Sequence, residues 1–256
     1  MLHLPPVPHQ RGVLVVVGGP AIPRLSSHRQ FNLLARSLAA DGVAAMRFDY
    51  RGMGDSEGAM RDFEGVGEDL RAAIDTFFSQ VPQMQEVVLW GLCDAASAAM
   101  LYARRRPRAR PGAGQSLGAH RGRRGQGHHQ ALLPGAPVRG RAVEKIASGQ
   151  FDLRAAARSF LRLVGAAKTQ TAADALPDRM HDAFAQFGGK ALVILSGADL
   201  TAREFEDLCG SSEQWKTLMQ TPRITQRALP RADHTCSRRE WHEQLVRWTS
   251  DWVQSF

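Results

Sequence analysis

Cys93 follows an apolar run, 87–90, and lies within Gly91-Leu92-Cys93-Asp94-Ala95, which opens an alanine-rich stretch. The pattern predicts a sharp strand-to-helix turn, a nucleophile elbow, because small residues two positions to either side of the cysteine leave room for the turn. The helix that follows would aim its N-terminal amides at the thiol, so we expect the thiolate to be lowered in energy. The alternative interpretation of an isolated cysteine is a small buried hydrophobe.

Asp199 and His234 each follow a later apolar run, so the chain order is nucleophile, acid, base. Acyl transfer through a thiol needs a base to take its proton and an acid to orient that base. We predict that His234 takes the proton of Cys93 and that Asp199 fixes the tautomer of the imidazole. Asp233 is the rival acid, but a direct chain neighbour is poorly placed to orient His234. The alternative for His234 is a loop residue that contributes only to capping the last helix.

Backbone amides are expected to hold the oxyanion of the acyl intermediate. One would come from Asp94 and a second from the Gly-rich loop that starts at Gly18. Pro20 has no N–H, so the second donor is either Gly19 or Ala21.

The composition fits one α/β domain, with 256 residues and 43% hydrophobic content. Three cysteines are too few and too scattered for a disulfide framework. The N-terminal residues lack the pattern of a leader, and no stretch has the length of a membrane span, so we expect a cytoplasmic protein. The sequence carries no fingerprint of a metal, nucleotide or flavin site, and no cofactor is predicted.

The formal net charge of +8 is concentrated in one segment. Residues 104–141 hold ten Arg and no Asp, Glu or Lys, which leaves the rest of the chain slightly acidic. The overall charge is therefore no argument for a nucleic-acid partner, and we predict none. An arginine-rich nucleic-acid arm is the alternative for the segment, but it lacks the interleaved aromatic residues such arms use.

Apolar runs alternate with amphipathic stretches along the chain, and this pattern predicts a doubly wound, mostly parallel sheet. The expected strands are 12–17, 43–48, 87–90, 192–195 and 224–229. The expected helices are 66–78, 95–102, 207–219 and 237–253, with another between Ser27 and Asp41 and helical stretches within 146–187.

Several motifs together resemble one family, the exosortase A system-associated hydrolases of type 1. The motifs are Gly18-Gly19-Pro20, Ser27-His28-Arg29-Gln30-Phe31, Arg47-Phe48-Asp49-Tyr50-Arg51-Gly52-Met53-Gly54-Asp55-Ser56, Gly91-Leu92-Cys93-Asp94-Ala95, Asp199-Leu200-Thr201-Ala202-Arg203-Glu204-Phe205 and Asp233-His234-Thr235. The resemblance implies an α/β-hydrolase with a cysteine nucleophile, similar in that choice to dienelactone hydrolase. It also implies a link to bacterial exopolysaccharide loci, and it fits an acyl substrate that is a small molecule or is linked to a lipid or glycan.

Residues 104–141 depart from this resemblance, since they are rich in Arg, Gly and Pro and have almost no apolar periodicity. We hypothesise a shifted reading frame between these positions, and we expect the sheet strand that belongs here to be missing or disordered. The predicted organisation is a core of 11–103 and 191–256, the irregular segment 104–141 and a helical cap region, 142–190. Loss of a strand would favour a second hypothesis, a catalytically impaired protein with a binding role.

Overall fold

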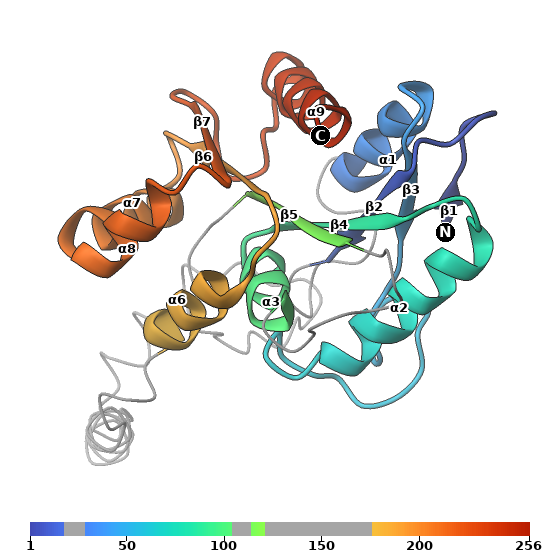
Figure 1. Ribbon diagram of the computed structural model, residues 1–256, viewed down its shortest axis with the longest axis horizontal. Coiled ribbons are helices and arrows are strands. Elements are labelled where there is room, and N and C mark those ends of the chain that lie inside the picture. The colour runs from blue at the N-terminus through green and yellow to red at the C-terminus, as the bar shows by residue number, and fades with distance from the viewer. Residues whose placement is uncertain (18–28, 104–113, 121–175) are drawn as a thin grey trace, which may run out of the picture. The chain divides into compact units, whose positions relative to one another are not determined.

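Seven strands form one sheet in the part of the chain that the structure, a computed structural model, describes (Figure 1). The described residues are 1–17, 29–103, 114–120 and 176–256, with the backbone alone for 114–120. The chain divides into two compact units, 1–124 together with 179–256, and 125–178. The first unit holds the whole sheet. Most of the predicted cap region lies outside the described residues.

The strands lie in the order β1-β3-β2-β4-β5-β6-β7, and all neighbours are parallel except β1 and β3. Their bounds are Leu2–His3 (β1), Arg11–Val16 (β2), Ala44–Arg47 (β3), Glu86–Leu92 (β4), Gly114–His120 (β5), Ala191–Ser196 (β6) and Ile224–Leu229 (β7). The carboxyl ends of the six parallel strands therefore meet at one edge, where ligands of open α/β sheets bind.

Buried, β-branched runs explain the central strands. Residues 13–17, in β2 and directly after it, are fully buried, as are Val87, Val88 and Leu89 of β4. A strand covered by helices on both faces needs a continuous apolar run rather than alternation. β7 is buried only at its two end residues, in keeping with its place at the edge of the sheet.

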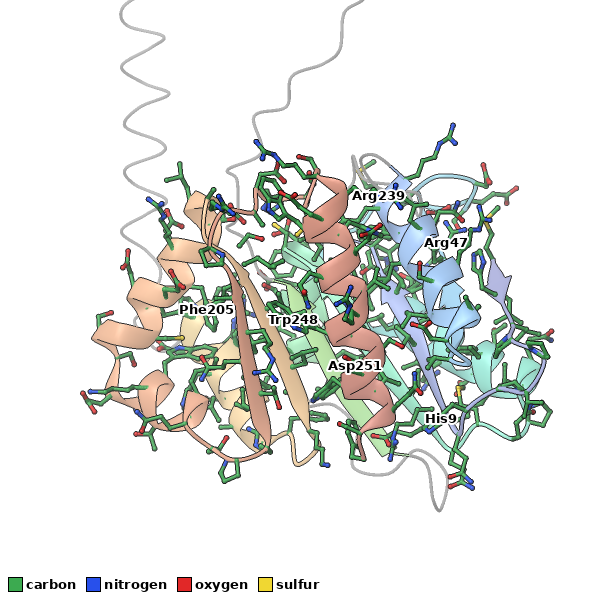
Figure 2. The ribbon with its side chains drawn as sticks, turned by 90° about the horizontal axis from the view of Figure 1, so that it is seen from above. His9, Arg47, Phe205, Arg239, Trp248 and Asp251 are labelled. Atoms are coloured by element: carbon green, nitrogen blue, oxygen red, sulfur yellow. The ribbon has the colours of Figure 1, made fainter. Side chains whose placement is uncertain are left out.

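Helices cover both faces of the sheet. Figure 2 shows α9, labelled at Arg239 and Asp251, beside α1 over one face, and α2 and α3 lie on the other face (Figure 1). The helix bounds are Gln30–Ala40 (α1), Gly67–Gln80 (α2), Asp94–Ala103 (α3), Leu176–Gln186 (α6), Leu200–Ser211 (α7), Glu213–Met219 (α8) and Arg239–Gln254 (α9). This layering confirms the predicted doubly wound, mostly parallel sheet.

The sequence predicts that a sheet strand is missing or disordered within residues 104–141, and for the backbone this prediction is wrong. β5 lies inside the arginine-rich segment and pairs with β4 on one side and β6 on the other. Neighbouring strands on both sides supply hydrogen-bond partners, so a backbone without an apolar run can still occupy an internal position in the sheet. Residues 104–113 and 121–141 of the segment lie outside the described residues.

The single helix predicted over 207–219 is also wrong, because two helices occupy this region. α7 already begins at Leu200, since the side chain of Asp199 accepts a hydrogen bond from the Thr201 amide and caps the helix. Ser212 separates α7 from α8 in an extended conformation.

Candidate active site

The turn at Cys93 joins β4 to α3 in a conformation that favours glycine. Cys93 has φ +60°, and its carbonyl accepts hydrogen bonds from the amides of Ala96 and Ser97 in the first turn of α3. A Cβ at Gly91 would lie 2.5 Å from the carbonyl carbon of Ala95, so only glycine fits there. A non-glycine residue held at positive φ is strained and is typical of functional sites. The predicted elbow is therefore present.

The Cys93 thiol lies in an environment that opposes its ionisation. Burial and the neighbouring Asp94 carboxylate raise the pKa of Cys93 to about 12, while a hydrogen bond from the Asp94 backbone amide acts in the opposite direction. The expectation of a thiolate lowered in energy is thus wrong for this state. The helix amide is present, but loss of solvation and a like charge outweigh it.

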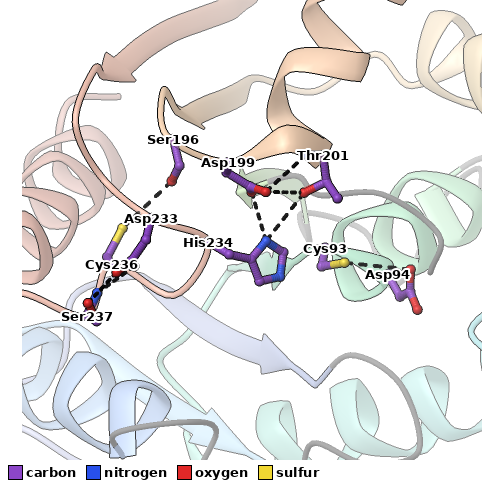
Figure 3. Close-up of polar contacts among 9 residues, drawn as sticks. All are labelled: Cys93, Asp94, Ser196, Asp199, Thr201, Asp233, His234, Cys236 and Ser237. Carbon is purple, nitrogen blue, oxygen red and sulfur yellow. Dashed lines mark hydrogen bonds and ion pairs between the residues drawn. The ribbon is translucent and has the colours of Figure 1, made fainter. Parts of the chain in front are cut away.

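Asp199 holds His234 from the end of β6. Asp199 Oδ2 lies 2.8 Å from His234 Nδ1, and Asp199 Oδ1 accepts hydrogen bonds from the Thr201 amide at 3.0 Å and the Thr201 hydroxyl at 2.6 Å (Figure 3). Burial works to raise the pKa of Asp199, but the hydrogen bonds from Thr201 and His234 outweigh it, and the net pKa is lowered. An ionised carboxylate therefore faces the imidazole.

The loops that carry Asp199 and His234 are joined by backbone hydrogen bonds. The Gly197 amide donates to the Leu229 carbonyl at 2.9 Å, and the Ala198 amide donates to the Ala232 carbonyl at 3.0 Å. A Cβ at Gly197 would collide with the backbone carbonyl of Pro230. The acid and the base are thus positioned by the continuation of β6 and β7 past their ends.

Asp233, the rival acid, is engaged elsewhere. Asp233 Oδ1 accepts a hydrogen bond from the Ser237 amide at 2.9 Å, and its second oxygen accepts one from the Ser237 hydroxyl. This arrangement closes the loop before α9 and leaves Asp199 as the carboxylate on Nδ1 of His234.

In the view of Figure 3, the imidazole of His234 is drawn between Asp199 and Cys93, and its Nδ1 contacts Asp199. The charge of Asp199 also acts on the Cys93 thiol, which is consistent with this grouping. The side chain of His234 is 35% exposed, whereas that of Asp199 is 5% exposed. A base open to the edge of the sheet and an acid buried behind it is an arrangement suited to proton transfer from a nucleophile.

Of the predicted oxyanion donors, only Asp94 can be placed. Its amide hydrogen-bonds the sulfur of Cys93, so it faces the position where an acyl oxygen would develop charge. Gly19 and Ala21 lie outside the described residues, and the choice between them stays a prediction.

Thr201 is a site residue that sequence reasoning missed. Its hydroxyl donates to Asp199 Oδ1 and lies 3.4 Å from His234 Nδ1. The sequence does hold a signal for it, because a hydroxyl residue two positions after a helix-capping Asp is a common local hydrogen-bonding pattern.

Across the described ranges, no group of three or more His, Cys, Asp or Glu side chains is arranged to hold a metal ion. Nor is any helix in these ranges long and apolar enough to cross a bilayer.

Fold and site together define a class: the chain has the α/β-hydrolase fold, with an elbow after β4, an acid after β6 and a histidine after β7. The model of the family described as serine aminopeptidase, S33, matches residues 8–126. No match was found among curated proteins.

Solved structures share the fold at low identity. Dienelactone hydrolase from Anabaena variabilis has a TM-score of 0.63 at 16% identity, covering 100% of this chain and 90% of its own. The monoacylglycerol lipase of Paleococcus ferrophilus has a TM-score of 0.59 at 16% identity, with coverage of 100% and 97%. An α/β serine hydrolase without lid from Xanthomonas campestris has a TM-score of 0.56 at 20% identity, with coverage of 100% and 89%.

Proposed function

We propose that the protein is an acyl hydrolase that cleaves an ester, thioester or related acyl bond through a covalent intermediate on Cys93. The observation that carries the proposal is the 2.8 Å contact between Asp199 and His234, on an imidazole that lies toward the cysteine of a strained elbow (Figure 3). The α/β-hydrolase fold and the match to a hydrolase family model support the reaction class.

In the first half of the reaction, Nε2 of His234 takes the thiol proton and Cys93 Sγ attacks the acyl carbon. The carbonyl oxygen takes up the electron pair and is held by the Asp94 amide and by the amide of Gly19 or Ala21. When the oxyanion collapses, the bond to the leaving group breaks, and the leaving group takes the proton from the imidazolium of His234. A thioester on Cys93 remains.

In the second half, His234 takes a proton from water, and the resulting hydroxide attacks the thioester. The C–S bond breaks, the carboxylic acid leaves, and the proton returns to Cys93. Asp199 stays ionised throughout and stabilises the imidazolium. Each step therefore balances without a metal or a cofactor.

The choice of cysteine is the part of the proposal that differs from the Xanthomonas campestris neighbour, which is named as an α/β serine hydrolase. Cysteine occupies the elbow position in this chain, at φ +60°, directly before α3. We also propose, from the family resemblance, an acyl substrate that is a small molecule or is linked to a lipid or glycan, and a role beside bacterial exopolysaccharide systems. A cytoplasmic location stays a prediction.

The test is hydrolysis of p-nitrophenyl and thioester substrates by the wild type and by Cys93→Ala. We expect Cys93→Ala to lower the rate by roughly 10³-fold or more, since removing one member of a cooperating triad removes most of its catalysis. Cys209→Ala, a change of the same size at a cysteine on α7, is the control and should leave the rate unchanged. Intact-mass measurement with a slowly deacylating ester should show one acyl group on Cys93. Equal rates for wild type and Cys93→Ala would remove Cys93 from the mechanism.

One observation favours a second candidate, an α/β-hydrolase-like protein with a binding role. The pKa of Cys93 is raised to about 12, which means that the resting thiol is a poor nucleophile at neutral pH. For this candidate we expect an ester analogue to bind without any acyl adduct on Cys93. An adduct in the same experiment would exclude it.

A further inference from the structure

The proton of the Cys93 thiol has an acceptor other than His234. Cys93 Sγ donates to Asp94 Oδ1 over 3.8 Å, a distance in the range of hydrogen bonds that involve sulfur (Figure 3). A thiol has a single proton and can make one such bond at a time. Asp94 Oδ1, a carboxylate oxygen of the next residue in the chain, is within reach of this proton.

The two carboxylates near the thiol have different positions and different tasks. Asp199 is occupied by Thr201 and by Nδ1 of His234, on the far side of the imidazole from the sulfur. Asp94 contacts the sulfur directly. A negative charge in direct contact disfavours the thiolate, and it also disfavours an acyl oxyanion at the Asp94 amide. The side chain of Asp94 therefore works against the chemistry that its own backbone amide would support.

The charge of Asp94 also reaches a second buried group. The charge of Asp94 acts on Tyr50 as well, a side chain that is 2% exposed. The pKa of Tyr50 is raised first by burial and then by the charges of Asp69 and Asp94. An electrostatic interaction with a buried phenol acts through a medium of low dielectric constant, where charges are weakly screened.

We propose that Asp94 is a positioning residue that holds the Cys93 thiol protonated and directed away from His234 in the resting protein. The inference rests on the proposed function for its chemistry and concerns the regulation of the same thiol. Attack begins only when the S–H bond turns from Asp94 Oδ1 toward Nε2 of His234. This step is a rotation about the Cβ–Sγ bond, so no covalent bond forms or breaks. The resting protein is thereby protected from adventitious alkylation and oxidation of its nucleophile, both of which act on the thiolate.

The test is the pH dependence of iodoacetamide alkylation at Cys93, followed by peptide mass spectrometry in the wild type and in Asp94→Asn. Asparagine keeps the size and the backbone amide of Asp94 and removes the charge. Below its pKa, the thiolate fraction rises tenfold for each unit by which the pKa falls. We therefore expect alkylation of Cys93 at pH 7.5 to be about tenfold faster or more in Asp94→Asn, with the midpoint of the profile shifted to lower pH. Asp94→Glu keeps a carboxylate at this position, and we expect alkylation of Cys93 in this variant to be slow, as in the wild type.

Two controls separate this result from a loosened structure. Cys236 is buried, and the carboxylates that act on it are Asp233 and Asp199, so its alkylation reports opening of the fold but not the charge of Asp94. Asp251→Asn removes one charge from the exposed face of α9 and should leave the profile of Cys93 unchanged. Identical Cys93 profiles in the wild type and Asp94→Asn would overturn the proposal, as would an acceleration shared equally by Cys236. Because alkylation needs no substrate, this outcome is independent of whether the protein hydrolyses esters.

Discussion

Asp199 is kept ionised against its own burial. Loss of solvation alone would favour the neutral acid, but two hydrogen bonds from Thr201 and one from His234 lower the pKa below its usual value. The ionised form can only accept a hydrogen bond, so Nδ1 of His234 donates its N–H to Asp199 and Nε2 keeps the lone pair that a general base needs. Thr201, which donates to the same carboxylate, therefore supports the base indirectly.

This lowered pKa predicts a pH-dependent contribution to stability. A carboxylate whose pKa is lower in the folded chain stabilises the fold at pH values above its unfolded pKa of about 4, and the contribution is lost as the pH falls through the folded pKa. We expect the Tm of Asp199→Asn to lie below that of the wild type at pH 7, and the difference to shrink as the pH is lowered from 5 to 2. Thermal unfolding of both proteins at pH 7 and from pH 5 to 2 measures this difference in Tm, with Asp251→Asn as the control. A difference in Tm that does not change with pH would contradict the prediction.

At the scale of elements, the acid and the base are brought together by backbone rather than by side chains. β6 and β7 continue to pair beyond their ends through Gly197 and Ala198, and this pairing places the two loops in register. Gly197 is needed because the carbonyl of Pro230 occupies the space that a Cβ would take.

We therefore expect Gly197→Ala to separate the two loops and weaken the contact between Asp199 and His234. The overlap is with backbone, which cannot rotate away, so the cost is about 1–3 kcal/mol of stability together with a large loss of hydrolysis. The measurements are Tm and ester hydrolysis. Gly210→Ala is the matched control, because a Cβ at that position in α7 meets nothing within 4 Å. Wild-type activity in Gly197→Ala would show that the register of these loops does not position the site.

Much of this arrangement can be predicted from the sequence, for a physical reason. Strands such as β2 and β6 are visible because burial requires apolar residues in a recognisable pattern. The start of α7 is harder to predict, because Asp199 has two roles: it caps the helix and it contacts His234. Its position after an apolar run predicts only the contact with His234. The acidity of Cys93 is predicted in the wrong direction, since the orientation of the Asp94 side chain and the burial of the thiol depend on tertiary structure.

At the scale of the whole molecule, the candidate site is assembled from both sides of β5. Cys93 follows β4, whereas Asp199 and His234 follow β6 and β7. β5 pairs with both β4 and β6, so it sets the distance between the nucleophile and its base. This strand belongs to the arginine-rich segment, 104–141, whose origin in a shifted reading frame stays a hypothesis. Resequencing that finds an uninterrupted frame, with matching peptides in the protein, would remove it.

The position of β5 predicts the effect of a proline within it. Leu117 is paired with Leu89 of β4 and with Ala191 of β6, so a proline there removes a backbone donor from a strand that has neighbours on both sides. We expect Leu117→Pro to lower the Tm and to abolish hydrolysis, because the two halves of the site would no longer be held in register. Leu117→Val keeps the backbone donor and a residue that favours strands, and it should fold and react as the wild type does. Thermal unfolding and ester hydrolysis of the two variants side by side make the comparison. If Leu117→Pro kept the wild-type Tm and rate, residues 114–120 would not form the strand that joins Cys93 to Asp199 and His234.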